Sequence, residues 1–307
     1  MNTILGALPD AAHVALLLGF PPLLLGVVNR AKSWFSGRAG PPLLQTYADL
    51  ARLLRKEFIL SRTTTGVFVA GPMVALATAL LAGLFVPFGS RAPWGFAGDA
   101  VAVLYLLGLG RFFTTIAALD TGSAFEGMGA AREVAFACLS EPVVFLALLA
   151  LHRLTGSLQL SVLLGSGLVG AWHQAAPTLA LLTAALFVVL LVEGCRIPFD
   201  DPNTHLELTM IHEVMVLDHS GPLFGVVLYG AALKLFLFAA FLVRLAAPVA
   251  TGSPWLDLGV FILGTLAVAV GIGVVESVMA RLKLPHVPTL LVGACVLAGF
   301  GFLLAWR

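Results

Sequence analysis

Long apolar runs alternate with short polar connections along this chain of 307 residues. A helix needs roughly 20 apolar residues to cross the hydrocarbon core of a bilayer, so each run of about this length predicts one spanning helix. We expect eight spans, at about residues 11–28, 66–87, 98–119, 131–151, 177–195, 223–247, 255–279 and 286–306. The stretch 158–172 is shorter and rich in glycine, which favours an interfacial or re-entrant segment. The pattern therefore predicts an all-α integral membrane protein with a single membrane domain over residues 1–307.

The first long connection carries a helical pattern of its own. Apolar residues recur at steps of three and four on one face, at Leu43, Tyr47, Leu50, Leu54 and Phe58. Polar residues recur in the same way on another face, at Gln45, Asp49, Arg52 and Lys56. This spacing is typical of an amphipathic helix, which we expect over residues 43–60 after the break at Gly40-Pro41-Pro42. Such a helix can lie flat on the bilayer, form a platform for a soluble partner, or do both.

Composition and charge support a membrane location and predict an orientation. Hydrophobic residues make up 60% of the chain and charged residues only 11%, and the net charge of +1 comes without the clustered Lys and Arg of a nucleic-acid-binding face. If the N-terminus is outside, the connections predicted inside contain Arg30, Lys32, Arg38, Arg52, Arg55, Lys56, Arg62, Arg132, Arg196, Arg281 and Lys283. The outside segments contain only Arg91, Arg153, Arg244 and Arg307. The positive-inside rule therefore predicts that both termini are periplasmic, in a bacterial cytoplasmic (inner) membrane.

Several ionisable residues fall within or beside the predicted spans. They are Arg111, Glu126, Arg132, Glu133, Glu141, Lys234 and Glu276. Charged groups inside a bilayer are costly and mark ion pathways, although Arg–Glu pairs can also lock helices together. For any one residue the structural role is a sufficient explanation, but the whole set favours a polar track for ions.

The inside loop 196–222 and its approach from Glu193 form the most polar part of the chain. The candidate functional side chains there are Glu193, Arg196, Asp200, Asp201, Glu207 and Glu213. A metal site is not indicated, because Val216 stands where an H-E-x-x-H motif starting at His212 needs its second histidine. Cys138, Cys195 and Cys295 are too widely spaced to predict an iron–sulfur cluster or structural zinc.

Three motifs carry a resemblance to a known family. The segment SGRAGPPLLQTYADLARLLRKE (36–57) resembles the sequence that follows the first helix in subunit 1 of respiratory complex I. GMGAAREVAFACLSE (127–141) and EGCRIPFDD (193–201) are similar to two further motifs of that family, in the same order. Together these motifs span most of the chain, and the family's eight helices and outside N-terminus agree with the pattern above.

The departures from that family indicate a branch of it. Asn29 stands where complex I subunits have a glutamate, and Asn203 and His205 replace two carboxylates of the acidic loop, while Glu207 remains. The sequence HLELTMIHE, followed by DHSGP and YGAALKL, resembles group 4 membrane-bound nickel–iron hydrogenases of the formate hydrogenlyase and hydrogenase-4 component C type. The resemblance implies a non-catalytic subunit that anchors a soluble hydrogenase and couples its redox chemistry to ion movement.

The resemblance also implies partners and roles. Hydrogenase large and small subunits and iron–sulfur subunits would hold the nickel–iron centre and clusters, this chain would hold none, and antiporter-like membrane subunits would pack alongside. Glu193, Arg196, Asp200 and Glu207 would line the interface below the hydrogenase, and Arg132, Glu133 and Glu141 would continue the path inward. Two alternatives remain open at this point: a proton-pumping, quinone-reducing complex I subunit 1, and a stand-alone ion transporter.

Overall fold

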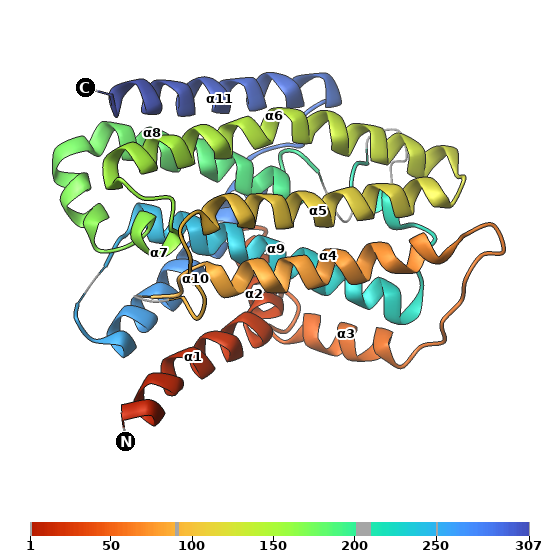
Figure 1. Ribbon diagram of the computed structural model, residues 1–307. Helices are drawn as coiled ribbons and strands as arrows, with labels where there is room; N and C mark the ends of the chain where they lie inside the picture. The colour runs from red at the N-terminus through yellow and green to blue at the C-terminus, as the bar shows by residue number, and fades with distance from the viewer. Residues whose placement is uncertain (1, 90–91, 201–209, 250, 307) are drawn as a thin grey trace.

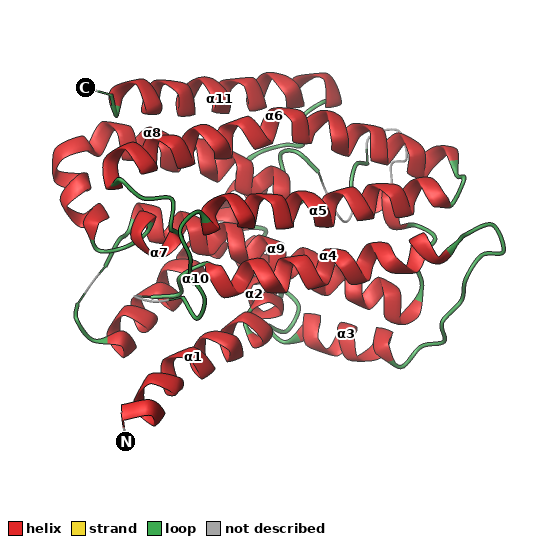
Figure 2. Cartoon of the chain, viewed as in Figure 1, coloured by secondary structure: helices red, strands yellow, loops and turns green. Residues whose placement is uncertain are grey.

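The protein is a bundle of long helices, described here from a computed structural model that covers residues 2–89, 92–200, 210–249 and 251–306 (Figure 1). The helices are α1 (Asn2–Gly19), α2 (Pro21–Phe35), α3 (Gln45–Leu54), α4 (Gly66–Phe85), α5 (Asp99–Asp120), α6 (Ala124–Thr155), α7 (Leu160–Leu163), α8 (Gly167–Glu193), η1 (Glu213–Val216), α9 (Gly221–Ala246), α10 (Pro254–Val278), η2 (Leu284–His286) and α11 (Val287–Leu304). Helices and loops account for all the described residues, with no strand among them (Figure 2).

Seven helices are long and apolar enough to cross a membrane, and the bent pair formed by α1 and α2 brings the number to eight. The chain is therefore a multi-pass, all-α membrane protein, as the apolar runs predict. Both termini lie at the same end of the bundle in Figure 1. We call this the terminal end, and the opposite end, which holds the connections after α2, α5, α8 and α10, the loop end.

The core forms where the long helices pack on one another. α9 contacts α2, α4, α8 and α10, while α11 lies on α6 and α8. Small residues allow close approach at several of these contacts. A side chain at Gly71 would collide with Ala117 and Phe113 of α5, and one at Gly301 would collide with Leu182 of α8. Without a hydrophobic driving force between helices in lipid, such close backbone packing is a main source of their association.

The first predicted span, 11–28, is not one straight helix. α1 ends at Gly19, and α2 begins at Pro21 at an angle of 52°. Pro21 and Pro22 have no backbone N–H to donate, so the helical hydrogen-bond ladder is interrupted at this point. The carbonyl groups at the bend find other donors, because the hydroxyl of Tyr229 donates to the Leu18 oxygen at 2.7 Å and Tyr47 bonds the Gly19 oxygen.

Two helices begin earlier than the apolar runs suggest. α6 starts at Ala124 rather than near residue 131, so its first turn carries the charged side chain of Glu126. α8 starts at Gly167 rather than near residue 177, and it is kinked at Ala175, two residues before Pro177. Hydropathy marks the part of a helix that lipid accepts, whereas the helix itself continues wherever its backbone hydrogen bonds are made.

The glycine-rich stretch 158–172 turns back without forming a span of its own. Its short α7 is held at both ends by buried charged side chains from neighbouring helices. Asp99 at the start of α5 accepts from the Leu160 N–H at 2.6 Å, and Arg244 near the end of α9 donates to the Leu164 oxygen at 2.7 Å. These bonds satisfy backbone groups that lipid could not.

The amphipathic segment is helical over a shorter range than predicted, since α3 covers Gln45–Leu54 rather than 43–60. It also lies along the bundle instead of across its end. Leu53 approaches Gly225 in α9, and the Glu57 oxygen approaches Gly221, while Tyr47 lies near the bend between α1 and α2. α3 therefore runs antiparallel to the first turns of α9, because small glycines on that helix leave room for it.

Candidate functional site

Arg111, in the middle of α5, is the centre of a charged network at the loop end. Its Nη2 atom donates to both carboxylate oxygens of Glu193, at 2.7 and 2.8 Å, and its Nε atom lies 3.2 Å from Glu133. The same guanidinium also bonds Glu141 through Nη1. One arginine thus holds three carboxylates from α6 and α8, in keeping with the planar fork of donors that a guanidinium provides.

Glu193 has two further partners. Lys234 in α9 places its ammonium 2.6 Å from Oε2, and the Ser140 hydroxyl donates to Oε1 at 2.9 Å. Glu193 is the last residue of α8 and is buried. Four helices therefore meet at this carboxylate, and each partner offsets part of the cost of removing it from water.

His212, just before η1, links this cluster to the polar loop. Its Nε2 atom lies 2.9 Å from Glu133, and its Nδ1 atom lies 3.3 Å from Asp200. Asp200 also accepts from the backbone N–H groups of Ile211 and His212, and it pairs with Arg281 at 3.1 Å. The loop is folded back into the bundle by these bonds.

The loop groups have shifted pKa values. Burial by itself lowers the pKa of His212, but the Cys195 thiol and the carboxylates of Glu133 and Asp200 outweigh burial and raise the pKa of His212 well above its ordinary value. Burial raises the pKa of Asp200, but hydrogen bonds and charge from His212, together with Arg281, lower it overall. Both shifts favour a charged imidazolium facing charged carboxylates at neutral pH.

With His212 protonated, the network pairs four cations with four carboxylates. The cations are Arg111, His212, Lys234 and Arg281, and the carboxylates are Glu133, Glu141, Glu193 and Asp200. The links run in one unbroken series from Arg281 at the loop end to Glu141 within a span. We call these eight residues the charged network.

A second group of charges lies beside the network. Glu276 of α10 is buried between Lys32 of α2, at 3.3 Å, and Arg196 of the loop, at 3.5 Å. The sequence predicts Glu276 as one of the charges within the spans, since it lies inside the predicted span 255–279, but it does not predict Lys32, which follows an apolar run and counts only among the inside charges. Only the packing of α2 on α10 brings them together.

Two residues predicted to lie on the ion path have other contacts. Arg132 donates to the Met210 backbone oxygen at 2.7 Å, and Glu126 accepts from the Asp218 N–H at 3.0 Å. No ion pair joins either side chain to the charged network among the described residues. Both side chains fasten the polar loop to α6, because they lie on helical turns that face the loop rather than Arg111, and their place in the ion path stays a prediction.

Several loop residues expected at a partner interface are buried in this chain, and their role at such an interface stays a prediction. Glu193, Arg196 and Asp200 are buried within the chain and bonded to its own side chains, because the loop folds back between the helices. Glu213 opens η1 and is half-buried. Asp201 and Glu207, the other two predicted residues, lie outside the residues that the structure describes.

Glu141 also departs from the prediction. Its side chain is 60% exposed on the outer face of α6, although it was expected to point into the protein and join a Glu133–Arg132 cluster. It reaches Glu133 only through Arg111. Position 141 falls on the exposed side of a helix whose Ser140 faces inward, since adjacent helical residues point about 100° apart.

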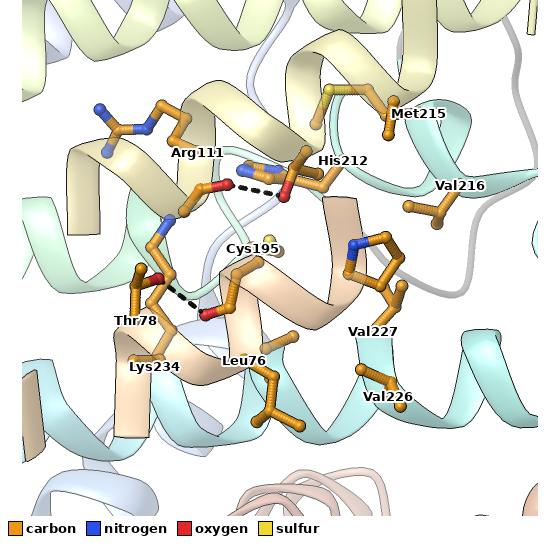
Figure 3. Close-up of a pocket in the computed structure, with 18 of the residues that line it drawn as sticks. Leu76, Thr78, Arg111, Cys195, His212, Met215, Val216, Val226, Val227 and Lys234 are labelled. Carbon is orange, nitrogen blue, oxygen red and sulfur yellow. Dashed lines mark hydrogen bonds between the residues drawn. The ribbon is translucent and has the colours of Figure 1, made fainter. Parts of the chain in front are cut away.

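A cavity of about 150 Å³ adjoins the network, between α4, α5, α9 and η1. Figure 3 shows the charged and polar side chains, among them Lys234, Cys195 and His212, gathered on one side of it, with Val226 and Val227 on the other. His219 also lines it and stacks on Phe68 at 4.0 Å between ring centroids. A cavity with polar partners on one side is able to hold ordered water.

Sequence reasoning missed His212 and Cys195 as members of the site. The sequence draws attention to His212 only as a possible metal ligand, and to Cys195 only as a possible ligand of an iron–sulfur cluster or structural zinc. Among the described residues, no three His, Cys, Asp or Glu side chains lie close enough to hold a metal ion. The prediction that metal centres belong to partner subunits remains a prediction.

The chain has clear relatives among known proteins. A family model described as NADH dehydrogenase matches residues 11–306. Formate hydrogenlyase subunit 4 of Escherichia coli (strain K12) is 32% identical over 304 residues, covering 93% of this chain and 92% of that protein. Hydrogenase-4 component C of the same organism is 30% identical over 238 residues, covering 77% and 74%.

A solved structure has the same fold. A chain of the membrane-bound sulfane sulfur reductase, an archaeal respiratory membrane complex, superposes with a TM-score of 0.80 at 19% identity, over 97% of this chain and 98% of that one. Given the family match over nearly its whole length and the extensive coverage of its hydrogenase relatives, the chain belongs to the NADH dehydrogenase family of membrane subunits, which the respiratory complex I subunit 1 motifs predict.

Proposed function

We propose that this chain is the membrane anchor and ion-coupling subunit of a group 4 nickel–iron hydrogenase or formate hydrogenlyase-like complex. The two relatives reported above carry those names and are covered over most of their length. In this proposal the chain is not itself catalytic. Hydrogenase large and small subunits and iron–sulfur subunits hold the nickel–iron centre and clusters, and antiporter-like subunits pack beside it in the bilayer.

The observation that carries the coupling role is the unbroken charged network. Its links connect the polar loop, through His212 and Glu133, to Arg111 and Glu141 within the spans. A pair of charges is enough to lock two helices, whereas the four carboxylates, His212 and Lys234 of the network give protons a series of sites, with Arg111 and Arg281 as fixed positive charges between them. A change in charge at the loop then alters the proton affinity of the next carboxylate along the series.

The arrangement also suggests how the soluble module acts on the network. Asp200 and Arg281 form its loop end, and they lie on the same end of the bundle as the connections rich in Lys and Arg. We place this end inside the cell and both termini in the periplasm of a bacterial inner membrane. A redox-linked charge in a subunit docked there would be felt first by this pair.

Glu141→Gln tests the coupling role most directly. The amide keeps the size of the side chain and one hydrogen-bond acceptor but cannot bind and release a proton. Because Glu141 is mostly exposed, its replacement strains the fold little. We expect assembly and hydrogenase activity with an artificial acceptor to be unchanged in inverted membrane vesicles, and activity-driven ion movement to fall at least tenfold.

Glu126→Gln is the matched control, since Glu126 lies in the same helix but outside the charged network. It should retain ion movement close to that of the unmodified complex. Ion movement that survives Glu141→Gln, or that is lost equally in both variants, contradicts the proposed path.

Purification of a tagged chain separates this proposal from a stand-alone transporter. We expect soluble nickel–iron and iron–sulfur subunits to be recovered in fixed ratio after mild detergent extraction. Recovery of this chain alone, with ion transport intact in liposomes, would favour the transporter.

A further inference from the structure

A hollow of about 370 Å³ opens at the loop end, separate from the charged network. It lies between the last turns of α2 and the turn that follows them. The polar residues that line it are Asn29, Lys32, Ser33, Ser36 and Arg38, and the backbone of residues 39–41 closes one side. No carboxylate is among the lining residues.

The wall of this hollow is an ordered turn that is closed by hydrogen bonds. Gly37 has a positive φ of 65°, which a glycine adopts without strain. This turn lets the Arg38 N–H donate to the Ser33 oxygen at 3.0 Å, so the chain reverses across the end of α2. Arg30 then braces the far wall by donating to the Gly40 oxygen at 3.2 Å.

Three donor groups with bonding capacity left converge on the hollow. The guanidinium of Arg38 and the side-chain amide of Asn29 make no hydrogen bond or ion pair with any described residue. The ammonium of Lys32 pairs with Glu276, and the Lys32 side chain is 32% exposed. Two cations and an amide form a donor set that binds a phosphate group, and Glu276, which pairs with Lys32, is not among the residues that line the hollow.

Exposed aromatic side chains mark where the rest of the ligand would lie. Trp34, on the same turn of α2 as Lys32, is 79% exposed, and its neighbour Phe35 is about half exposed. Both stand at the end of the first membrane-crossing pair of helices, Leu8–Phe35. Tryptophan at the end of a span beside Lys and Arg is typical of the headgroup layer of a bilayer.

We propose that this hollow binds the phosphate of an anionic phospholipid, with Arg38, Lys32 and Asn29 around the headgroup and the acyl chains along Trp34 and Phe35. The site lies beside Glu276 and Arg196, so a bound lipid would fix the end of α2 against the polar loop. An anionic lipid is favoured over a zwitterionic one, because the hollow presents cations and no acceptor for a choline group.

Native mass spectrometry of the purified complex tests the site, with phosphatidylglycerol titrated into delipidated sample. Arg38→Gln should weaken retention of one phosphatidylglycerol about tenfold, which corresponds to about 1.4 kcal/mol. Lys32 is left unchanged, because its removal would strand the buried carboxylate of Glu276. Arg62→Gln is the control: Arg62 is exposed on the same connection but outside the hollow, and its loss should change retention less than twofold.

Four results would overturn the proposal. The first is equal loss of lipid in the two variants, and the second is phosphatidylcholine bound as tightly as phosphatidylglycerol. The third is competition by inorganic phosphate that displaces the lipid fully, since a free anion would then be the ligand. If Arg38→Gln instead releases a protein subunit and leaves lipid retention unchanged, the hollow docks a partner and the lipid assignment is wrong.

Discussion

The two longest connections at the loop end are similar in polarity but opposite in burial. In the first, residues 36–65, the five basic side chains Arg38, Arg52, Arg55, Lys56 and Arg62 are all exposed. In the second, the described part of 194–220 buries Arg196, Asp200 and His219 and joins His212 to the helices. A charge that stays in water needs no partner, whereas a charge drawn into the bundle must find one. Burial, rather than the number of charges, therefore distinguishes the two connections.

Removal of Arg111, the central cation of the buried network, should have the largest effect on stability. Arg111→Gln leaves the buried carboxylates of Glu133 and Glu193 without the counter-charge that they share. Breaking a buried ion pair from one side typically costs about 3–5 kcal/mol. We expect the variant to accumulate poorly in the membrane and to unfold at a markedly lower temperature in detergent.

Arg111→Lys provides the control, because it restores the charge without the forked geometry. It should recover part of the lost stability. If Arg111→Gln is as stable as the unmodified chain, the network is hydrated and its charges are not held as tightly as the packing indicates.

His212→Gln should have an intermediate effect that depends on pH. The folded-state pKa of His212 is raised above the unfolded value of about 6.5. The stabilisation by its imidazolium is therefore complete below about pH 6.5 and is lost as the pH rises through the folded pKa. The loss of its charged hydrogen bonds should cost about 1–3 kcal/mol at pH 6.

Hydrogen exchange gives the readout for this prediction, since the backbone N–H groups of Ile211 and His212 both donate to Asp200. In the unmodified chain their protection should decrease as the pH rises above neutral, after correction for the intrinsic exchange rate. In His212→Gln it should be lower at pH 6 and nearly flat. A sloping profile in the variant would assign the pH dependence to another group.

A substitution in the exposed connection should have the smallest effect. Arg52 pairs with Asp49 at 3.0 Å on the exposed surface of α3, with 65% of the Arg52 side chain accessible. Surface pairs of this kind contribute about 0–1 kcal/mol. Arg52→Gln should therefore shift the unfolding midpoint only slightly. A loss comparable to that of Arg111→Gln would show that α3 is covered by a partner in the purified sample.

Much of the candidate site was predictable as a set of residues but not as a set of contacts. Glu133, Glu141, Arg111 and Lys234 stand out because a charge within an apolar run is costly and rare. Their partners could not be inferred, because the i, i+4 spacing shows which residues share a face of one helix but not which residues of another helix pack against that face. Arg132 is one residue from Glu133, yet it bonds the Met210 backbone while Glu133 bonds Arg111.

The sequence by itself determined that this protein is a helical membrane protein with a polar loop before α9, since lipid requires long apolar helices and the apolar runs are long enough. Its motifs also determined the family. The tertiary structure alone decided that Asp200 and His212 are drawn into the bundle and that Glu276 meets Lys32. The physical reason is the separation along the sequence over which each effect acts. Hydropathy and helix breaks act within about 20 residues. A buried charge is stabilised by groups far away in the chain, such as Lys234 and Ser140 around Glu193.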